Sequence, residues 1–126
     1  MAIYFFISKT GSELMENNLK EQIPLTETMF LVLLTMLKEN YGYRVSQEVE
    51  EITKGRIVLG PGTLYGAINN LNKKGWIKSV DTGSESGKKI YVATDVGREL
   101  VALEINRMKT LVAEGEKKFK TEEEHE

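Results

Sequence analysis

Residues 55–75 read GRIVLGPGTLYGAINNLNKKG, and this stretch determines the fold expected for the whole chain. Gly60 lets the backbone turn, and Pro61 suits the first position of a helix because its φ angle is already helical. Apolar residues then recur at helical spacing until Gly75, which fits the position just after a helix end. We therefore predict a helix between these two glycines, called the 60–75 helix below. Its buried face is expected to consist of Leu64, Ala67, Ile68 and Leu71.

The opposite face of the 60–75 helix carries residues that a purely solvated surface would not favour, since Glu, Lys, Gln and Ala give more stable helices. Asn amides can pair bidentately with adenine edges, Gly lets a surface come close, and Tyr can donate its hydroxyl to a phosphate. This composition indicates a helix that reads DNA, and the alternative is a polar helix of poor propensity. The outward residues are Tyr65, Gly66, Asn69, Asn70, Lys73 and Lys74.

The segments on both sides of this helix predict a winged helix-turn-helix domain. LTETMFLVLLTMLKE over residues 25–39 and YRVSQEVEEITK over residues 43–54 are typical of helices, the first with Thr26 as its N-cap. Residues 76–82 and 88–94 are typical of strands and are joined by a five-residue loop. Three helices followed by a hairpin make a mainly α fold of the α+β type with a two-stranded wing.

The predicted wing carries Lys88 and Lys89 at its base, within reach of phosphates that flank the groove occupied by the helix. The alternative is a solvent-exposed hairpin whose lysines keep it soluble and protect its edge. We favour the wing because the 60–75 helix lies immediately upstream of the hairpin, as in DNA-binding domains of this kind.

Two helices carry more apolar surface than one small domain needs. The 25–39 helix is apolar nearly all round, so one face can serve the core and the other, with Met29 and Leu33, a second subunit. A long helix over 95–120, capped by Thr94, has a four-three-four apolar repeat that favours packing against a symmetry mate. The alternatives are a core helix in a monomer and an amphipathic helix that folds back on its own domain. The repeat consists of Val101, Ile105, Met108 and Val112.

Charge is distributed unevenly along the 126 residues, whose net charge is −2. Residues 1–53 have a net charge of −4, residues 54–89 of +5 and residues 90–126 of −3. The positive charge therefore coincides with the 60–75 helix and the wing. Clustering of this kind, rather than the total charge, is the electrostatic signature of a nucleic-acid-binding surface.

Composition argues against several other functions. The sequence has no cysteine, which rules out disulfides and thiolate metal sites. No apolar run approaches the roughly 20 residues of a membrane span, so we expect a cytoplasmic protein without a membrane partner. The single histidine, His125, stands in the charged tail, and no nucleophile and base show catalytic spacing. We expect neither an enzyme nor a bound cofactor or metal.

The two ends of the chain are expected to lie outside the domain. Met15 begins a more ordinary opening than the apolar run after Met1, so our hypothesis is that residues 1–14 are dispensable. The N-terminal extension is expected to be disordered or to form a short helix, and the acidic tail to fray. The predicted organisation is an extension over 1–24, a winged helix-turn-helix domain over 25–94, a dimerisation helix over 95–120 and a tail over 121–126.

Three segments of the chain carry a likeness to a known family: LTETMFLVLLTML, YGYRVSQEVEEITKGRIVLGPGTLYGAINNLNKKGWI and GKKIYVATDVGREL. The most specific part is LGPGTLY, followed by Leu71 and by GWI over 75–77, with Thr94 and Gly97 further on. From about Leu25 to Leu111 the chain resembles the PadR family of transcriptional regulators. It departs from the family pattern at Ala93, where members more often have a larger aliphatic residue.

The resemblance implies a homodimer, usually a repressor, that binds a pseudo-palindromic operator and is held together largely by its C-terminal helix. The resemblance allows a small-molecule effector at the dimer interface, where some short members bind flat aromatic compounds with a Trp of the last helix, but this chain has no Trp on that helix. The only Trp of this chain is Trp76. Carried over by position, the residues that contact DNA are Tyr43, Thr63, Tyr65, Asn69 and Lys73, and those of the wing are Gly87 and Lys88.

We therefore expect a sequence-specific transcriptional regulator that binds double-stranded DNA as a homodimer, with its two DNA-reading helices in successive major grooves. The alternative from another class is a winged-helix module that binds proteins and has lost DNA binding. The net charge of +5 over residues 54–89 distinguishes the two, since a protein-binding module would not need it.

Overall fold

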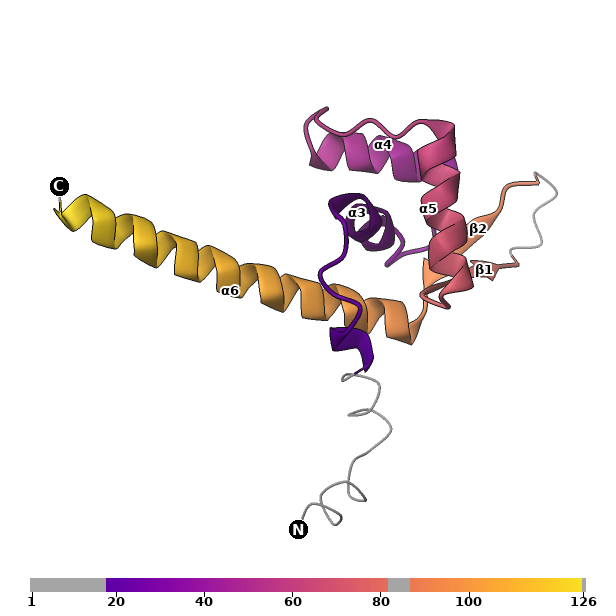
Figure 1. The fold of residues 1–126 in the computed structure, drawn as a ribbon. Helices are drawn as coiled ribbons and strands as arrows, with labels where there is room; N and C mark the ends of the chain where they lie inside the picture. The colour runs from indigo at the N-terminus through magenta and orange to yellow at the C-terminus, as the bar shows by residue number, and fades with distance from the viewer. Residues whose placement is uncertain (1–17, 82–86, 126) are drawn as a thin grey trace, which may run out of the picture.

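A computed structural model describes residues 18–81 and 87–125, and Figure 1 shows a helical domain from which one long helix projects. The order of its elements is the winged helix-turn-helix order that the sequence predicts, followed by a long C-terminal helix. The elements are α3 (Glu27–Thr35), α4 (Gly42–Ile52), α5 (Pro61–Lys73), β1 (Ile77–Val80), β2 (Ile90–Ala93) and α6 (Asp95–His125).

α3 lies at the centre of the domain because it is apolar nearly all round. α4, α5 and α6 all pack against it, and Val32, Leu33 and Met36 are fully buried. Thr26 caps its first turn as predicted, with its hydroxyl oxygen accepting a hydrogen bond from the Met29 N–H at 3.2 Å. The sequence left two interpretations of this helix, a helix shared with a second subunit and a core helix of the protomer. The burial of Leu33 agrees with the core helix.

The loop between α4 and α5 is held by contacts close to its start. Lys54 (φ 52°) and Gly55 (φ 81°) both adopt left-handed conformations just after α4, and such residues end a helix and redirect the chain. The Thr53 hydroxyl donates to the Val49 carbonyl oxygen at 2.9 Å and accepts from the Ile57 N–H at 3.0 Å. These contacts fix the course of the chain toward α5.

α5 begins at Pro61 and ends where its sequence predicts. The Trp76 N–H donates to the Leu71 carbonyl oxygen and the Gly75 N–H to the Asn72 carbonyl oxygen, both at 3.0 Å. Gly75 has a φ of 76°, so this is the Schellman arrangement that stops a helix and turns the chain into β1. The buried face consists, as predicted, of Leu64, Ala67, Ile68 and Leu71.

β1 and β2 form an antiparallel hairpin in which Ile77 pairs with Ala93. Asn40 forms an isolated bridge with Tyr91 on the other edge of β2, with N···O distances of 2.9 and 2.8 Å. No strand is expected at Asn40 from the sequence, because one bridging residue leaves no alternating pattern. The bridge ties the wing to the chain between α3 and α4.

Several elements are shorter than predicted. α3 covers residues 27–35 rather than 25–39, because the chain must turn after Thr35 to place Asn40 beside β2. The Asn40 side-chain amide donates to the Thr35 carbonyl oxygen at 3.0 Å and stabilises this turn. α4 ends two residues early at Ile52, and the strands lack the outer residues of the predicted runs.

The first turn of α6 packs against the peptide group of Trp76. Thr94 caps the helix as predicted: its hydroxyl donates to the Gly75 carbonyl oxygen at 2.8 Å and accepts from the Gly97 N–H at 3.2 Å. A Cβ atom on Gly97 would lie 2.1 Å from the Trp76 carbonyl oxygen, so only glycine fits there. This junction fixes the direction in which α6 leaves the wing.

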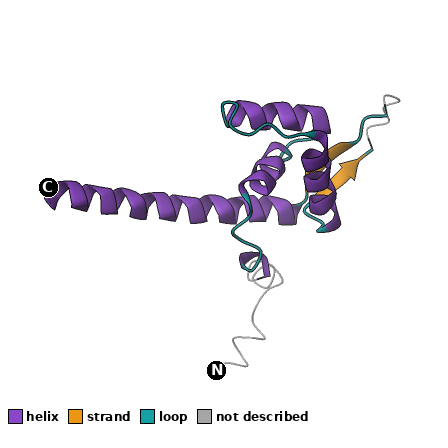
Figure 2. Ribbon diagram, turned by 45° about the horizontal axis from the view of Figure 1, so that its top comes forward, coloured by secondary structure: helices purple, strands orange, loops and turns teal. Residues whose placement is uncertain are grey.

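α6 has a first half that belongs to the domain and a second half that projects from it (Figure 2). Leu100 and Val101 are buried and Met108 is half-buried, whereas every side chain from residue 109 to 123 is exposed. The 31 residues of the helix span about 46 Å at the standard rise. Among the described residues, no helix is both long and apolar enough to cross a membrane.

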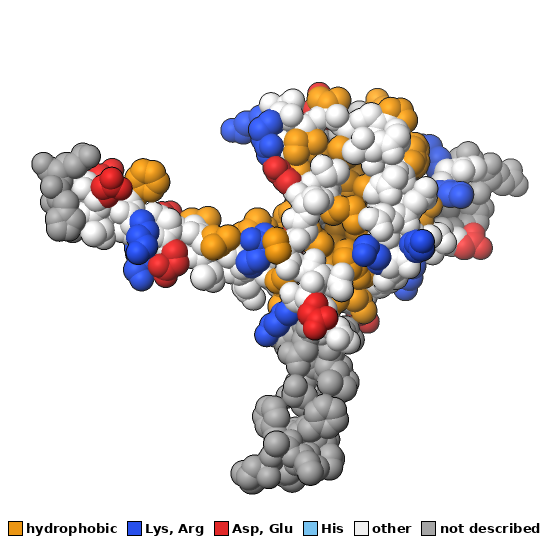
Figure 3. Space-filling view, viewed as in Figure 1, with side chains coloured by type: hydrophobic (Ala, Val, Ile, Leu, Met, Phe, Trp, Pro, Cys, Tyr) orange, Lys and Arg blue, Asp and Glu red, His pale blue; other side chains and the backbone are white. Residues whose placement is uncertain are grey.

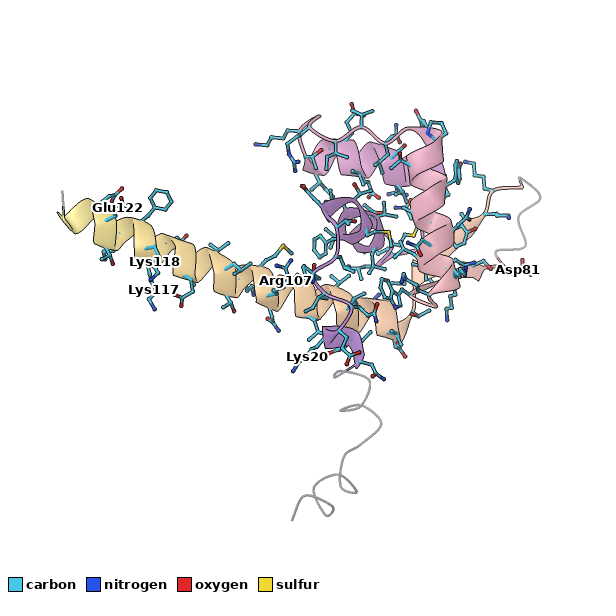
Figure 4. All side chains as sticks on the ribbon, in the orientation of Figure 1. Lys20, Asp81, Arg107, Lys117, Lys118 and Glu122 are labelled. Carbon is cyan, nitrogen blue, oxygen red and sulfur yellow. The ribbon has the colours of Figure 1, made fainter. Side chains whose placement is uncertain are left out.

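α6 continues through residues 121–125, where the sequence predicts a frayed tail. Glu and Lys, which dominate this part, are strong helix formers. Lys117 Nζ also lies 3.6 Å from Glu114 Oε1, an exposed pair at helical spacing that adds a small stabilisation. Figure 4 labels Lys117, Lys118 and Glu122 on this projecting part.

The packed domain begins before Leu25. Residues 18–20 are helical, Leu19 is buried, and Ile23 is half-buried against the core. The end of the predicted N-terminal extension therefore belongs to the domain. The hypothesis that residues 1–14 are dispensable falls outside the described residues.

A buried carboxylate joins this N-terminal segment to α6. The Glu104 side chain is 1% exposed, and its Oε2 accepts a hydrogen bond from the Leu25 N–H at 3.0 Å. Arg107 donates to both carboxylate oxygens, with Nε 2.6 Å from Oε1. The hydrogen bonds from Arg107 lower the pKa of Glu104 and outweigh the burial that raises it. The carboxylate is therefore ionised inside the folded protein at neutral pH.

We predict that Gly97→Ala destabilises the fold by about 1–3 kcal/mol, because the added methyl group overlaps a backbone oxygen. Gly66→Ala is the control, since a Cβ at Gly66 meets nothing within 4 Å and alanine in a helix is favoured by about 0.5–1 kcal/mol. Urea unfolding followed by circular dichroism measures both changes. Equal midpoints for Gly97→Ala and the wild type would contradict the close approach at Trp76.

We also predict that Glu104 makes stability depend on acidic pH. Its pKa in the folded state lies below the ordinary 4.5, so its ion contributes stability that is complete above 4.5 and is lost as the pH falls through the folded-state pKa. Glu104→Gln keeps an acceptor for the Leu25 N–H but cannot titrate. The free energy of unfolding of the wild type should therefore fall more steeply below pH 4.5 than that of the variant. Parallel curves from urea unfolding over this range would rule out this carboxylate as the cause.

Candidate nucleic-acid interface

The outer face of α5 is a continuous polar stripe. Because Leu64, Ile68 and Leu71 are buried against the core, the residues between them are turned outward. Gly66 adds no side chain to this face, and the space that a Cβ would enter is open. A flat surface can therefore approach the helix along the stripe. Its exposed members are Thr63, Gly66, Asn69, Asn70 and Lys73.

The Tyr65 ring leaves this stripe and covers the start of α4. A Cβ on Gly42 would come within 2.9 Å of the Tyr65 hydroxyl oxygen, so glycine at this position lets the ring lie there. Tyr65 remains 53% exposed, and Tyr43 in the first turn of α4 is 67% exposed. The N-cap residue Tyr41 makes no side-chain capping bond, so the first N–H groups of α4 keep their capacity to donate.

The base of the wing brings two lysines to the same side of the domain. Lys88 Nζ lies 4.4 Å from the centre of the Tyr41 ring, a cation–π contact that holds the ammonium group beside the start of α4. Gly87, with a φ of 73°, gives the chain the left-handed conformation that leads into this contact. Lys89 is exposed next to it.

The start of α4, the outer face of α5 and the base of the wing border an open cavity of about 730 Å³. These three parts lie apart in the chain, at residues 41–43, 65–69 and 87–91, and the fold brings them together. The predicted site residues that line the cavity are Tyr43, Tyr65, Asn69, Gly87, Lys88 and Lys89.

Basic side chains gather over α5 and the strands, on the right-hand side of the molecule in Figure 3. Lys73 and Lys74 are exposed at the end of α5, and Lys74 Nζ lies 5.1 Å from the centre of the Trp76 ring. Arg56 differs from the lysines because it forms an ion pair with Glu27 at the start of α3. Their hydrogen bond lowers the pKa of Glu27 and raises that of Arg56. Arg56 therefore serves to hold the loop before α5 to α3.

The residues predicted to contact a second subunit fall into two groups. Leu33 and Val101 are 0% and 2% exposed, because α3 and the first half of α6 pack against each other inside the protomer. Neither offers surface to a partner, and this part of the prediction is corrected. The half-buried or exposed members are Met29, Ile105, Met108 and Val112.

Sequence reasoning missed two residues that shape the site, Tyr41 and Gly42. Their signal is the run NYGY over residues 40–43 at the start of α4, which is also an ordinary turn composition. Their role becomes visible only in the contacts with Lys88 and Tyr65, which lie far away in the chain.

The donors that this surface presents are amides, hydroxyls, ammonium groups and backbone N–H groups. Such groups bind by hydrogen bonds, charge and stacking on the tyrosine rings. Over residues 18–81 and 87–123, no three His, Cys, Asp or Glu side chains come together as metal ligands. The side chain of His125 lies outside the described part of the chain.

Comparison with known proteins relates the chain to regulators of transcription. The profile of the transcriptional regulator PadR-like family matches residues 30–103, which is more than half of the sequence. None of the curated proteins matches the chain.

Solved structures share the fold. A transcriptional regulator from Clostridium thermocellum is 27% identical with a TM-score of 0.62, over 73% of this chain and 88% of that one. A Streptococcus transcriptional regulator is 28% identical with a TM-score of 0.59, over 70% of this chain and 87% of that one. Bacillus subtilis PadR, solved in complex with operator DNA, is 22% identical with a TM-score of 0.52, over 63% of this chain and 46% of that one. At 22% identity, the similarity to the Bacillus protein shows only that the two proteins share a fold.

Proposed function

Because the chain belongs to the PadR-like family of transcriptional regulators, we propose that it binds double-stranded DNA sequence-specifically as a homodimer and represses transcription. The observation that carries this proposal is the meeting of the α5 stripe, the start of α4 and the wing lysines on one face. The operator DNA held by the Bacillus protein of the same fold supports DNA as the partner.

α5 is the element that we assign to the major groove. Asn69 and Asn70 offer amides that can pair with adenine edges, and the missing side chain at Gly66 lets the helix backbone come close to the bases. Thr63 lies near one end of the stripe and Lys73 near the other, where they can reach base edges or phosphates. All five positions are exposed on the outer face of the helix, so they can meet the groove together.

Phosphate contacts are assigned to the residues that surround the groove-reading helix. Tyr43 and Tyr65 can donate their hydroxyls, and the N-terminus of α4 presents backbone N–H groups with no acidic residue in its first turn. Lys88 and Lys89 approach from the wing, and Lys74 from the end of α5. Each phosphate that a lysine neutralises releases counterions, so affinity falls steeply as salt rises.

A second copy of the chain is the partner that we assign to the projecting half of α6. Leu111, Val112 and Phe119 are 58%, 57% and 73% exposed on a helix that no other described part of the chain covers. An isolated helix of about 15 residues is marginal in water, so this half gains stability when its apolar side is buried. A hollow of about 410 Å³ along Ile105, Met108 and Val112 leaves room for side chains of another helix.

The sequence of this half suits an antiparallel pair of helices. The four-three-four spacing continues beyond Val112 through Gly115 and Phe119, so an apolar seam runs almost to the end of α6. With a two-fold axis near residue 113, Lys109 of each protomer faces Glu116 of the partner subunit. This charge pairing favours the antiparallel arrangement.

An effector held between the subunits would have to share the hollow along α6 with the partner helix. The rival function, a winged-helix module that binds another protein, leaves the net charge of +5 over residues 54–89 without a purpose. The open polar stripe of α5 also lacks the apolar anchors that dominate protein–protein interfaces. Both observations favour DNA.

The first functional prediction concerns Lys73. Lys73→Glu removes a cation from the outer end of α5 in both protomers and adds an anion that repels phosphate. We expect DNA affinity to fall by about a hundredfold or more while the circular dichroism spectrum stays unchanged. The measurement is a gel shift with genomic fragments that the purified wild-type protein retains.

Lys38→Glu is the matched control, because it changes the net charge by the same amount as Lys73→Glu. Lys38 is exposed and does not line the 730 Å³ cavity. It should retain most of the affinity. Equal losses in both variants would indicate an effect of total charge, and unchanged binding by Lys73→Glu would remove α5 from the groove.

The second functional prediction concerns the dimer. Met108→Asp places a carboxylate in the apolar seam, so we expect monomers at concentrations where the wild type is dimeric. Thr110→Asp is the control, because Thr110 is exposed and lies off the seam. Analytical ultracentrifugation gives the mass of each variant. A dimer that survives Met108→Asp would exclude this face of α6 as the interface.

A further inference from the structure

Asn40 lies in the short connection between α3 and α4 and is one of two buried polar residues in the part of the chain that the structure describes. It is 4% exposed, and the other is Glu104 at 1%. The contacts of Glu104 with Leu25 and Arg107 account for its burial. A buried amide is costly unless its hydrogen-bonding groups have partners, so the partners of Asn40 indicate what it does.

Every hydrogen-bonding group of the Asn40 side chain has a partner. Nδ2 donates to the Thr35 carbonyl oxygen at the end of α3, at 3.0 Å, and to the Glu48 carboxylate on α4. Oδ1 accepts a hydrogen bond from the Tyr41 N–H at 2.9 Å. Because Nδ2 faces two acceptors and Oδ1 faces a donor, the amide has only one satisfactory orientation. The side chain therefore connects α3, α4 and the N-cap residue of α4.

The backbone of Asn40 is bonded to the wing at the same time. Its N–H donates to the Tyr91 carbonyl oxygen at 2.9 Å, and its carbonyl oxygen accepts from the Tyr91 N–H at 2.8 Å. The Ala93 N–H donates to the Met36 carbonyl oxygen at 2.7 Å, so β2 is attached to this connection at two points. A single residue thus joins the two helices to the hairpin.

We propose that Asn40 is a positioning residue for DNA binding, which sets where the base of the wing lies relative to α4. Its Oδ1 holds the N–H of Tyr41, whose ring centre lies 4.4 Å from Lys88 Nζ. Asn40 is buried and does not itself reach DNA, so it acts through Lys88. The inference rests on the proposed function, in which Lys88 contacts a phosphate of the DNA.

The role requires an amide. Leucine at position 40 could keep the backbone bridge to Tyr91, but it would leave the Tyr41 N–H and the Thr35 carbonyl oxygen without their partner. Aspartate has the shape of asparagine, but its second oxygen would face the Glu48 carboxylate, which repels it. Glu48→Gln would then supply a side-chain N–H that can donate to the new carboxylate.

These differences give a test in which the salt dependence of DNA binding is measured by fluorescence anisotropy with a retained genomic fragment. Asn40→Asp should weaken binding by about tenfold. It should also reduce the slope of log affinity against log salt concentration by about two per dimer, one for each Lys88 contact that is lost. Asn40→Leu should have the same two effects, and because it adds no charge it excludes simple repulsion of the DNA.

The rescue variant combines Asn40→Asp with Glu48→Gln and has the net charge of the wild type. It should recover most of the affinity and of the salt slope, because the hydrogen bond between positions 40 and 48 is restored with its donor and acceptor exchanged. Glu48→Gln alone keeps an acceptor for the Asn40 amide and should bind DNA as the wild type does.

Further variants separate positioning from stability, with each titration made where circular dichroism shows the protein to be folded. Lys88→Gln should weaken DNA binding about tenfold in the wild type but less than about twofold in Asn40→Asp, because that contact is already lost. Tyr41→Leu removes the ring and leaves the buried amide in place, so it tests the link to Lys88 even if the changes at Asn40 prevent folding. Its salt slope should also fall by about two per dimer.

Three results would overturn the proposal. They are a wild-type salt slope in folded Asn40→Leu or in Tyr41→Leu, a rescue variant that binds no better than Asn40→Asp, and additive losses from Lys88→Gln and Asn40→Asp.

A wild-type protein that retained no DNA would contradict the proposed function, and hydrogen exchange would still test the position of the wing. The Tyr91 amide should exchange about tenfold or more faster in Asn40→Asp than in the wild type, and more slowly again in the rescue variant. Equal exchange in the wild type and Asn40→Asp would overturn the positioning role by itself. Failure of the two proposals is therefore distinguishable.

Discussion

The burial of one face of α5 against α3 is the contact on which the rest of the structure depends. Leu64, Ile68 and Leu71 enter the core, and the fixed periodicity of a helix then determines which side chains face outward. The same contact therefore builds the hydrophobic core and aims the polar stripe. It also stabilises a helix whose outer residues, with Gly66 and two adjacent asparagines, would make it weak in isolation.

Around α5 the fold assembles a surface from segments that are distant in sequence. The wing is tied to α5 by the Schellman turn at Gly75 and to the α3–α4 connection by the bridge between Asn40 and Tyr91. These two attachments place Lys88 beside Tyr41. Backbone hydrogen bonds thus fix the position of exposed side chains whose own contacts contribute little stability, and this leaves the side chains available for a partner.

α6 links this surface to the proposed dimer. Its first turn is locked to the Trp76 peptide by Gly97, and its first half is held in the core by Leu100, Val101 and the buried Glu104. The second half projects as one continuous helix (Figure 1). A helix is stiff over this length. The angle between α6 and the wing, which is fixed at Gly97, therefore determines where a second protomer would lie. The separation of two DNA-reading surfaces would then follow from packing near the wing.

The sequence by itself determined the order of the elements, the ends of α5 and its buried face. These depend on local causes, namely the turn residues Gly60 and Gly75, proline at position 61 and the helical spacing of apolar residues. It also located the concentration of positive charge. Periodicity reports only that a face is buried and not what covers it. For this reason Leu33 and Val101 were predicted at a subunit interface, although the protomer's own core covers them.

Only the tertiary structure decided which distant side chains meet. The cavity between α4, α5 and the wing, the Tyr65 ring over Gly42 and the carboxylate of Glu104 beneath Leu25 all join segments that no local pattern connects. Short-range preferences act over a few residues, whereas these contacts depend on the angles at which helices pack. Those angles follow from the shape of the whole core.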